Sequence, residues 1–280
     1  MRCLQQNIEL PGRDATARIW GLFDIHLGNA LCDEALLDAT IKRIADDPLA
    51  WWIGGGDYAD FINRKDPRHM ESRLATWLHG KDDIALAQRS RVVEKLKPIA
   101  GKCLALLKGN HEESILRHCE RDIYWRMVEE LSDGRELALG TQGFLTLRLG
   151  RPNSRDRRMV VFYLHHGYGG GKLDGGKALA LGRLATSYDF DVALMGHVHS
   201  RHVLGSQVRL GPTTRGDGRL TMRPMRAAFC GSFLHSVDPR GEVEQYSEAA
   251  GYAPLATGSL WVEITPFSGK AEQMDIRVVV

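Results

Sequence analysis

The strongest constraint in this sequence is a pattern that occurs five times: a run of apolar residues ends at a glycine or at a side chain that can bind a metal ion. Such a run is typical of a buried strand, and glycine lets the backbone turn sharply after it. In layered α/β proteins, functional sites form at the carboxyl ends of strands. The five runs are 17–23 before Asp24, 49–53 before Gly54 to Asp57, 103–107 before Lys108 to His111, 159–164 before His165 to Gly167, and 192–195 before Gly196 to His199.

Amphipathic stretches between these strands predict helices. Apolar residues recur at helical spacing over 33–47, and this stretch stops at Pro48. The stretch 70–97 predicts two helices that are broken near 79–81. Two more helices are predicted over 113–131 and 176–188, and four more strands over 143–149, 226–230, 260–264 and 274–280.

Length and composition fit one globular domain. The 280 residues, 43% of them hydrophobic, suit a single α/β unit spanning residues 1–280, with a helical insertion or cap at 61–98 and a basic loop or hairpin at 201–226. A formal net charge of +2 is too small to indicate a nucleic-acid or membrane partner by bulk attraction. The five cysteines form no CxxC pair, and no apolar stretch resembles a signal peptide or a membrane span. We therefore expect a cytoplasmic protein with reduced cysteines and no membrane partner.

The polar residues at the strand ends are carboxylates, imidazoles and one amide, without a thiolate. This set suits borderline divalent metals better than a soft, thiolate-bound ion. One carboxylate can also bridge two cations held about 3.5–4 Å apart. The motifs are Asp24-x-His26, Gly56-Asp57-x-x-Asp60, Gly109-Asn110-His111-Glu112, His166-Gly167 and Gly196-His197-x-His199.

These motifs, in this order from Asp24 to His199, resemble those of the calcineurin-like metallophosphoesterases, which are DxH, GDxxD, GNH[DE], H and GHxH. The GHxH form is similar to that of cyclic-nucleotide and other small phosphodiesterases, and GDYADFINRKDPR resembles a segment of phage and prophage phosphoesterases. The resemblance implies an α/β fold of the αββα type, in which two mixed β-sheets form a sandwich flanked by helices. It also implies two divalent metal ions, with Mn favoured and Fe, Zn, Co and Ni as alternatives.

The same resemblance assigns the metal ligands residue by residue. It implies that one ion is held by Asp24, His26, Asp57 and His199, and the other by Asp57, Asn110, His166 and His197. His165 competes with His166 for one position, but the family ligand precedes glycine, so we assign His166. We expect His165 to face the other way, either as a core residue or as one that supports the ligands. Glu112 is interpreted as a complement to the dipole of the helix that follows it.

The resemblance also implies a mechanism: a metal-bridging hydroxide attacks phosphorus. His111, next to the predicted ligand Asn110, is placed to give the leaving group its proton, and Asp60 is expected to orient His111. We expect Asn110, His111, Lys172 and Arg201 to contact the substrate.

Three functions are compatible with these residues. The first is a metal-dependent phosphodiesterase or nuclease, with DNA or RNA as substrate. The second is a phosphomonoesterase or nucleotide phosphatase that acts on a small substrate, and the third is a noncatalytic, metal-bound scaffold module. Protein serine/threonine phosphatases of the family have Arg-Gly after GDxxD and Arg before GNHE, where this chain has Phe61-Ile62 and Lys108, which argues against a phosphoprotein substrate.

Two arginine-rich segments bear on the choice among these functions. Segment 148–158 has an excess of four positive charges, and segment 201–226 has an excess of five. Because the second follows the GHxH motif, it is predicted to line the substrate entrance and to bind a polyanion. The alternative is a solvated hairpin whose charges meet the acidic C-terminal stretch.

Overall fold

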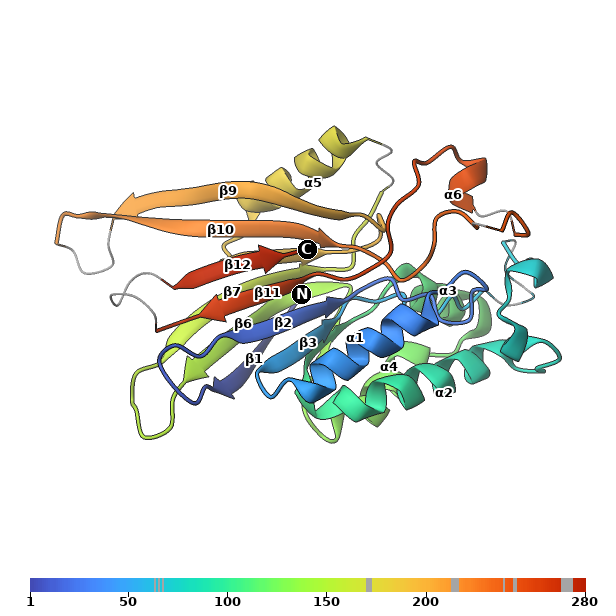
Figure 1. Ribbon diagram of the computed structural model, residues 1–280, viewed down its shortest axis with the longest axis horizontal. Coiled ribbons are helices and arrows are strands. Elements are labelled where there is room, and N and C mark those ends of the chain that lie inside the picture. The colour runs from blue at the N-terminus through green and yellow to red at the C-terminus, as the bar shows by residue number, and fades with distance from the viewer. Residues whose placement is uncertain are drawn as a thin grey trace.

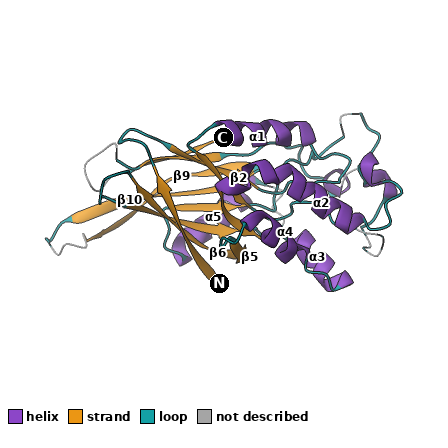
Figure 2. Cartoon of the chain, turned by 90° about the horizontal axis from the view of Figure 1, so that it is seen from below, coloured by secondary structure: helices purple, strands orange, loops and turns teal. Residues whose placement is uncertain are grey.

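The structure is a computed structural model in which two mixed β-sheets lie face to face, with helices on both outer sides (Figure 1). This arrangement confirms the predicted α/β class and the αββα sandwich. Seen from below, most of the helices gather toward one end of the molecule, and the longest strands extend toward the other (Figure 2). The structure describes residues 1–62, 64, 66, 68–169, 173–212, 217–238, 240–243, 246–267 and 274–280.

The first sheet has six strands in the described part of the chain. Strand β6 is parallel to β1 and antiparallel to β7, while β7, β8 and β10 run parallel and β9 returns antiparallel to β10. In spatial order these strands are β1 (Arg2–Glu9), β6 (Gln142–Gly150), β7 (Arg158–His165), β8 (Val192–Met195), β10 (Leu220–Cys230) and β9 (Arg201–Pro212).

The second sheet also has six strands within the described residues. Strands β2 to β5 run parallel, and β11 and β12 continue the sheet as an antiparallel pair beside β2. In spatial order these strands are β12 (Asp275–Val279), β11 (Trp261–Thr265), β2 (Ala17–Leu22), β3 (Ala50–Gly54), β4 (Cys103–Leu107) and β5 (Ala138–Gly140).

Helices cover the outer face of each sheet, and short polar residues define where several of them begin. The carboxylate of Asp33 accepts the backbone N–H of Leu36 at 2.9 Å and so caps the first helix. No helix in the described ranges is both long and apolar enough to cross a membrane. The helices are α1 (Glu34–Asp46), α2 (Ile84–Leu96), α3 (Asn110–Cys119), α4 (Ile123–Ser132), α5 (Asp174–Ser187) and α6 (Tyr246–Ala249), with 3-10 turns at Glu71–Arg73, Thr76–Leu78 and Lys97–Lys102.

Three apolar layers hold the sandwich together. Between the sheets, side chains such as Ile53 of β3 and Phe162 of β7 are fully buried. Outside the second sheet, α1, α2 and α4 pack on residues such as Trp52, and outside the first sheet α5 packs through Leu181. Burial of apolar side chains in these layers is the main stabilising contribution to the fold. Five loops at one end of this framework are thereby fixed in place.

The structure differs from the predicted elements in several places. Strand β1 was not predicted, because only Leu4 and Ile8 of its polar sequence are buried. The expected helix over 113–131 is two helices, since Glu120 adopts a left-handed conformation with a φ of 54° and Asp122 caps α4. The first of the two helices predicted over 70–97 is replaced by short 3-10 turns.

The segment 61–98, predicted as a helical insertion or cap, includes α2. This helix belongs to the connection between the parallel strands β3 and β4, and its buried Val92 joins the same apolar cluster as Ile41 of α1. The helical part of this segment is therefore a component of the outer layer. The earlier part of the segment runs past the loop after β2, where Ala30 N–H donates to the carbonyl of Arg73 at 2.8 Å.

Candidate metal centre

The carboxyl ends of five strands meet at one end of the sandwich and bring the predicted ligands together. Asp24 and His26 follow β2, Asp57 follows β3, and Asn110 follows β4 in the second sheet. From the first sheet, His166 follows β7, and both His197 and His199 follow β8. Within the described residues, three groups of side chains have potential ligand atoms within 4.8 Å of one another. They are Asp24, His26 and His199; Asp57, His166 and His197; and His26, Asp60 and His111.

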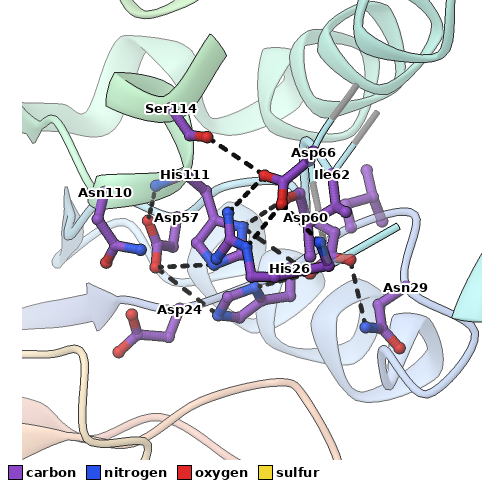
Figure 3. Close-up of polar contacts among 12 residues, drawn as sticks. Asp24, His26, Asn29, Asp57, Asp60, Ile62, Asp66, Asn110, His111 and Ser114 are labelled. Atoms are coloured by element: carbon purple, nitrogen blue, oxygen red, sulfur yellow. Dashed lines mark hydrogen bonds and ion pairs between the residues drawn. The ribbon is translucent and has the colours of Figure 1, made fainter. Parts of the chain in front are cut away.

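Asp57 is a member of the second group and also faces His26 of the first (Figure 3). Its Oδ2 atom is 3.8 Å from Nε2 of His26 and 3.4 Å from Nε2 of His166. Its other oxygen, Oδ1, accepts the backbone N–H of His111 at 2.9 Å. Burial opposes ionisation of Asp57, but the positive charges of His166 and His111 hold its pKa well below the usual range. One buried carboxylate oxygen therefore faces a histidine from each predicted metal site.

The hydrogen bonds of His166 leave one of its ring nitrogens directed at acceptors. Nδ1 lies 2.8 Å from the carbonyl of Gly55, which can only accept, so Nδ1 carries a hydrogen. Nε2 then faces Oδ1 of Asn110 at 3.0 Å, as well as Asp57. Although burial opposes it, the charge of Asp57 raises the pKa of His166 to about 10, which places a second proton on the ring. A divalent cation would satisfy the same oxygen and nitrogen lone pairs.

His26 has the same arrangement on the other side of Asp57. Its Nδ1 is 3.3 Å from Oδ1 of Asp60, and its Nε2 is 3.1 Å from Nε2 of His199. Burial and the neighbouring His26 keep the pKa of His199 well below its usual value, and burial likewise lowers that of His197. Both rings are therefore neutral, as metal binding requires.

Asp24 gives the clearest test of whether these residues fit a cation. Its Oδ2 accepts the backbone N–H of His197 at 2.7 Å, but its Oδ1 is buried without a hydrogen-bond partner. Burial raises the pKa of Asp24 to about 8. A buried acceptor without a partner is unfavourable, and a metal ion would satisfy it. The donor set and this oxygen fit divalent cations. Which residue holds which ion stays a prediction.

The structure brings the predicted catalytic pair together, with a different contact between them. Nδ1 of His111 is hydrogen-bonded to the backbone carbonyl of Asp60, while Oδ1 of that residue is 3.9 Å away. The Asp60 carboxylate instead contacts His26 and accepts the side-chain amide of Asn29 at 3.4 Å. Asp60 thus orients His111 through its main chain and the predicted ligand His26 through its side chain.

The backbone is strained at most of the predicted ligands. Left-handed φ angles are rare for residues other than glycine and cost about 1–3 kcal/mol each. They recur here at five predicted ligands, with φ between 49° and 71°: Asp24, His26, Asp57, His197 and His199. A left-handed residue reverses the direction of the backbone just after a strand, so that the side chains there are directed into the site. Strain of this kind is concentrated where a site requires a fixed geometry.

Close backbone approach explains the glycine before Asn110. A Cβ atom at Gly109 would lie 2.1 Å from Oδ1 of Asp57 and 2.4 Å from the backbone nitrogen of Asp57. Only glycine allows the start of α3 to come this near to the β3 loop. The contact places Asn110, the first residue of α3, beside the shared carboxylate.

Glu112 has a larger role than its interpretation as a complement to the helix dipole. Its side chain is buried and accepts three backbone N–H groups, from Asp57 at 3.0 Å, Tyr58 at 2.8 Å and Gly109 at 2.8 Å. Burial, together with the charge of Asp57, raises the pKa of Glu112 to about 7. One carboxyl group thereby fixes both the β3 loop and the start of α3.

Two supporting residues at the site come from the first sheet. Nδ1 of His165 accepts the N–H of Gly167 at 2.8 Å, and burial lowers the pKa of His165 to about 4, so His165 supports the turn at His166 as a neutral ring. Ser232, which the sequence did not single out, donates its hydroxyl to the carbonyl of Asp24 at 2.7 Å. Its only signal in the sequence was its place after an apolar run that ends in Cys230 and Gly231.

Two of the predicted substrate contacts, Lys172 and Arg201, lie outside the five motifs. Lys172 lies outside the described residues. Arg201 begins β9 and rests its side chain on two backbone segments, since a Cβ at Gly231 would lie 2.6 Å from its Cγ and one at Gly258 would lie 3.2 Å from its Nη1. Contact of either side chain with substrate stays a prediction.

The described part of the basic segment 201–226 lies mostly in β9 and β10, but two of its arginines are far from the entrance predicted for them. Arg223 donates to Asp191 at 2.8 Å, and Arg209 forms an ion pair with Asp189. Both acids precede β8, whereas the predicted ligand His197 follows it, so the ion pairs lie at the opposite end of that strand. For these two arginines the predicted place at the substrate entrance is wrong, because they pair with acidic groups at the amino end of β8. Contact of the segment with a polyanion stays a prediction.

Comparison with known proteins adds limited information. No protein-family model and no curated protein matches the sequence. Among solved structures, a metallophosphoesterase from Sphaerobacter thermophilus aligns with 12% identity and a TM-score of 0.37, covering 94% of this chain and 88% of that one. A conserved uncharacterized protein from Streptococcus pneumoniae TIGR4, described as a predicted phosphoesterase, aligns with 11% identity and a TM-score of 0.33, covering 94% and 98%. Values this low decide neither the fold nor the activity of this chain.

Glu112→Gln tests the role of the buried carboxyl group. The substitution turns one acceptor oxygen into an amide that faces backbone N–H donors, and we expect the free energy of unfolding of the metal-free protein to fall by about 1–3 kcal/mol. Urea unfolding measures this change, and elemental analysis should show reduced metal content. The matched control is Glu113→Gln, because that neighbouring side chain is partly exposed and pairs with Lys108 and Arg117. Equal stability of the two variants would contradict the role.

The raised pKa values predict how metal-free stability depends on pH. Between about pH 6.5 and 8 the folded protein holds protons on Asp24 and His166 that the unfolded chain releases, so its stability falls as the pH rises. Bound cations replace these protons, so the gap in Tm between protein with Mn²⁺ and protein with a chelator should widen over the same range. Differential scanning calorimetry checks this, and in the chelator Asp24→Asn should show a shallower fall. A gap that is constant with pH would refute the explanation.

Proposed function

We propose that this protein is a hydrolase of phosphate esters that uses two divalent metal ions and belongs to the calcineurin-like class that its motifs resemble. The observation that carries the proposal is Oδ2 of Asp57, which faces Nε2 of His26 on one side and Nε2 of His166 on the other. A carboxylate placed in this way is suited to bridge two cations. Two further observations support the same conclusion. Oδ1 of Asp24 is buried without a hydrogen-bond partner, and ring nitrogens of His166 and His197 both face Oδ1 of Asn110.

When bound, the two metal ions would lower the pKa of a coordinated water and neutralise charge on the phosphate oxygens. The ligand side chains would hold the ions in two sets that share Asp57. One set would be Asp24, His26, Asp57 and His199, and the other would be Asp57, Asn110, His166 and His197.

His111 is the group that would give a proton to the leaving oxygen. Its Nδ1 bonds the carbonyl of Asp60, so Nε2 is the ring nitrogen that can exchange a proton with substrate. Burial disfavours the charged ring, yet without cations the charges of Asp57 and Asp60 raise the pKa of His111. The backbone N–H of His111 also binds Asp57, which ties the acid to the shared ligand.

For the substrate, we propose a phosphodiester, with nuclease activity on DNA or RNA as the specific form. The support is the GHxH motif formed by His197 and His199. Arg209 and Arg223 pair with acidic residues away from the metal centre, so these two side chains do not support a long polyanion as the substrate. Hydrolysis of small monoesters is the alternative, and we propose Mn²⁺ as the metal to test first because carboxylate and imidazole ligands suit it.

Substitution of His111 by glutamine tests the assigned acid. Glutamine keeps the backbone contact to Asp57 and removes the proton donor, so we expect kcat for an unactivated diester to fall about 10²–10⁴-fold with little change in metal content. Steady-state kinetics and elemental analysis of the same preparations provide the measurement. Equal loss of metal and activity would show that His111 acts on the metal site and not on the leaving group.

The substrate class is tested by supplying Mn²⁺ with bis-p-nitrophenyl phosphate, p-nitrophenyl phosphate, and labelled single- and double-stranded DNA. Faster hydrolysis of the diester and cleavage of DNA are the expected results. A monoester preference with intact DNA would replace the nuclease assignment by a phosphatase. If no ester is hydrolysed while both metals are bound, the chain is a noncatalytic metal-bound module.

A further inference from the structure

A buried carboxylate next to the metal centre fixes a half-exposed arginine that the proposed mechanism does not use. Arg68 donates from Nε to Oδ1 of Asp66 at 3.0 Å and from Nη2 to Oδ2 at 2.7 Å. The Asp66 side chain is only 4% exposed, whereas that of Arg68 is 47% exposed. A bidentate pair of this kind fixes both the position and the plane of the guanidinium.

The ion pair is attached to the same helix as the catalytic site. Oδ2 of Asp66 accepts the hydroxyl of Ser114 at 3.3 Å, and Ser114 lies one turn after Asn110 and His111 on α3 (Figure 3). The chain reaches Asp66 six residues after Asp60. Asp66 therefore ties the loop after Asp60 to the helix that carries the proposed acid.

The hydrogen bond between Asp66 and Ser114 places the ion pair beside α3, the helix whose first turn carries Asn110 and His111. The guanidinium is also near enough to Asp60 and Asp57 for their charges to raise the pKa of Arg68, after the larger contribution of Asp66. This is the side of the proposed acid, and hence of the leaving group. A fixed positive charge here is unfavourable beside two divalent cations unless an anion lies between them. The contact with Asp66 uses Nε and Nη2, which leaves the Nη1 edge outside the ion pair.

We propose that Arg68 binds a phosphate oxygen of the substrate on the leaving-group side of the metal centre, an inference that rests on the proposed phosphoesterase function. The bound phosphate oxygen can come from two places in a substrate. The oxygen belongs either to the phosphate that is hydrolysed or to a neighbouring phosphate, as in a nucleic acid. Asp66 is the positioning residue, since it holds the guanidinium without reaching the substrate itself.

The test compares Arg68→Ala and Arg68→Lys with Arg64→Ala. Arg64 is a suitable control because it is an exposed arginine of the same loop, with its guanidinium on the carbonyls of Lys81 and Asp82. Each Mn²⁺-loaded protein is assayed on bis-p-nitrophenyl phosphate, which has one phosphate, and on hexathymidylate, which has neighbouring phosphates and serves as substrate or competitive inhibitor. Titration calorimetry with inorganic phosphate gives a readout that needs no turnover.

We expect Arg68→Ala to raise KM, or the inhibition constant, about tenfold or more, which corresponds to about 1.4 kcal/mol, while kcat changes much less. Arg68→Lys should recover part of the lost affinity, because lysine keeps the positive charge but lacks the bidentate hydrogen bonds of the guanidinium. An effect on both esters, with weaker phosphate binding, identifies the hydrolysed phosphate. An effect confined to hexathymidylate identifies a neighbouring one.

The proposal is overturned if Arg68→Ala and Arg64→Ala give the same KM, inhibition constant and phosphate affinity at equal metal content. Failure of the proposed function has a different signature, namely that the wild-type protein hydrolyses no ester with both metals bound. In that case the phosphate and hexathymidylate binding measurements still decide whether Arg68 forms an anion site.

Discussion

The buried negative charge of Asp57 is the constraint on which the rest of the site depends. A carboxylate in the protein interior is stable only when charges and hydrogen bonds surround it. Here they come from both sheets: His26 follows β2, the backbone N–H of His111 opens α3, and His166 follows β7. The sandwich has to bring these separate strand ends to one point, and the left-handed turns and the contact at Gly109 are the local means by which it does so.

The hydrogen-bond pattern around this charge has more acceptors than donors. The ring of His166 directs Nε2 at the oxygens of Asp57 and Asn110, and Asp24 keeps one buried oxygen without a partner. Protons on His166 and Asp24 balance this excess in the absence of cations, which is why the pKa values of both groups are raised. Protons and metal ions thus compete for the same lone pairs.

The clustering of the proposed ligands could be predicted from the sequence because parallel strands bring their carboxyl ends to one edge, and each of the five apolar runs ends beside a proposed ligand. What the sequence could not show were contacts chosen by tertiary packing. It did not show that Asp60 reaches His111 through its carbonyl and His26 through its carboxylate, or that Glu112 holds three backbone groups. Strand β1 was missed for a related reason, since its pairing with β6 compensates for a sequence with few apolar residues.

Charge location matters more for substrate binding than the number of charges. The arginines that dominate segment 201–226 include Arg209 and Arg223, which pair with acids at the amino end of β8. Arg68 belongs to segment 61–70, whose excess is only two positive charges, yet Asp66 fixes it beside the helix that carries His111. A mobile surface arginine loses conformational freedom when it binds an anion, whereas this one is already held in place. Preorganised contacts of this kind favour a small number of well-placed phosphate oxygens over general attraction to a polyanion.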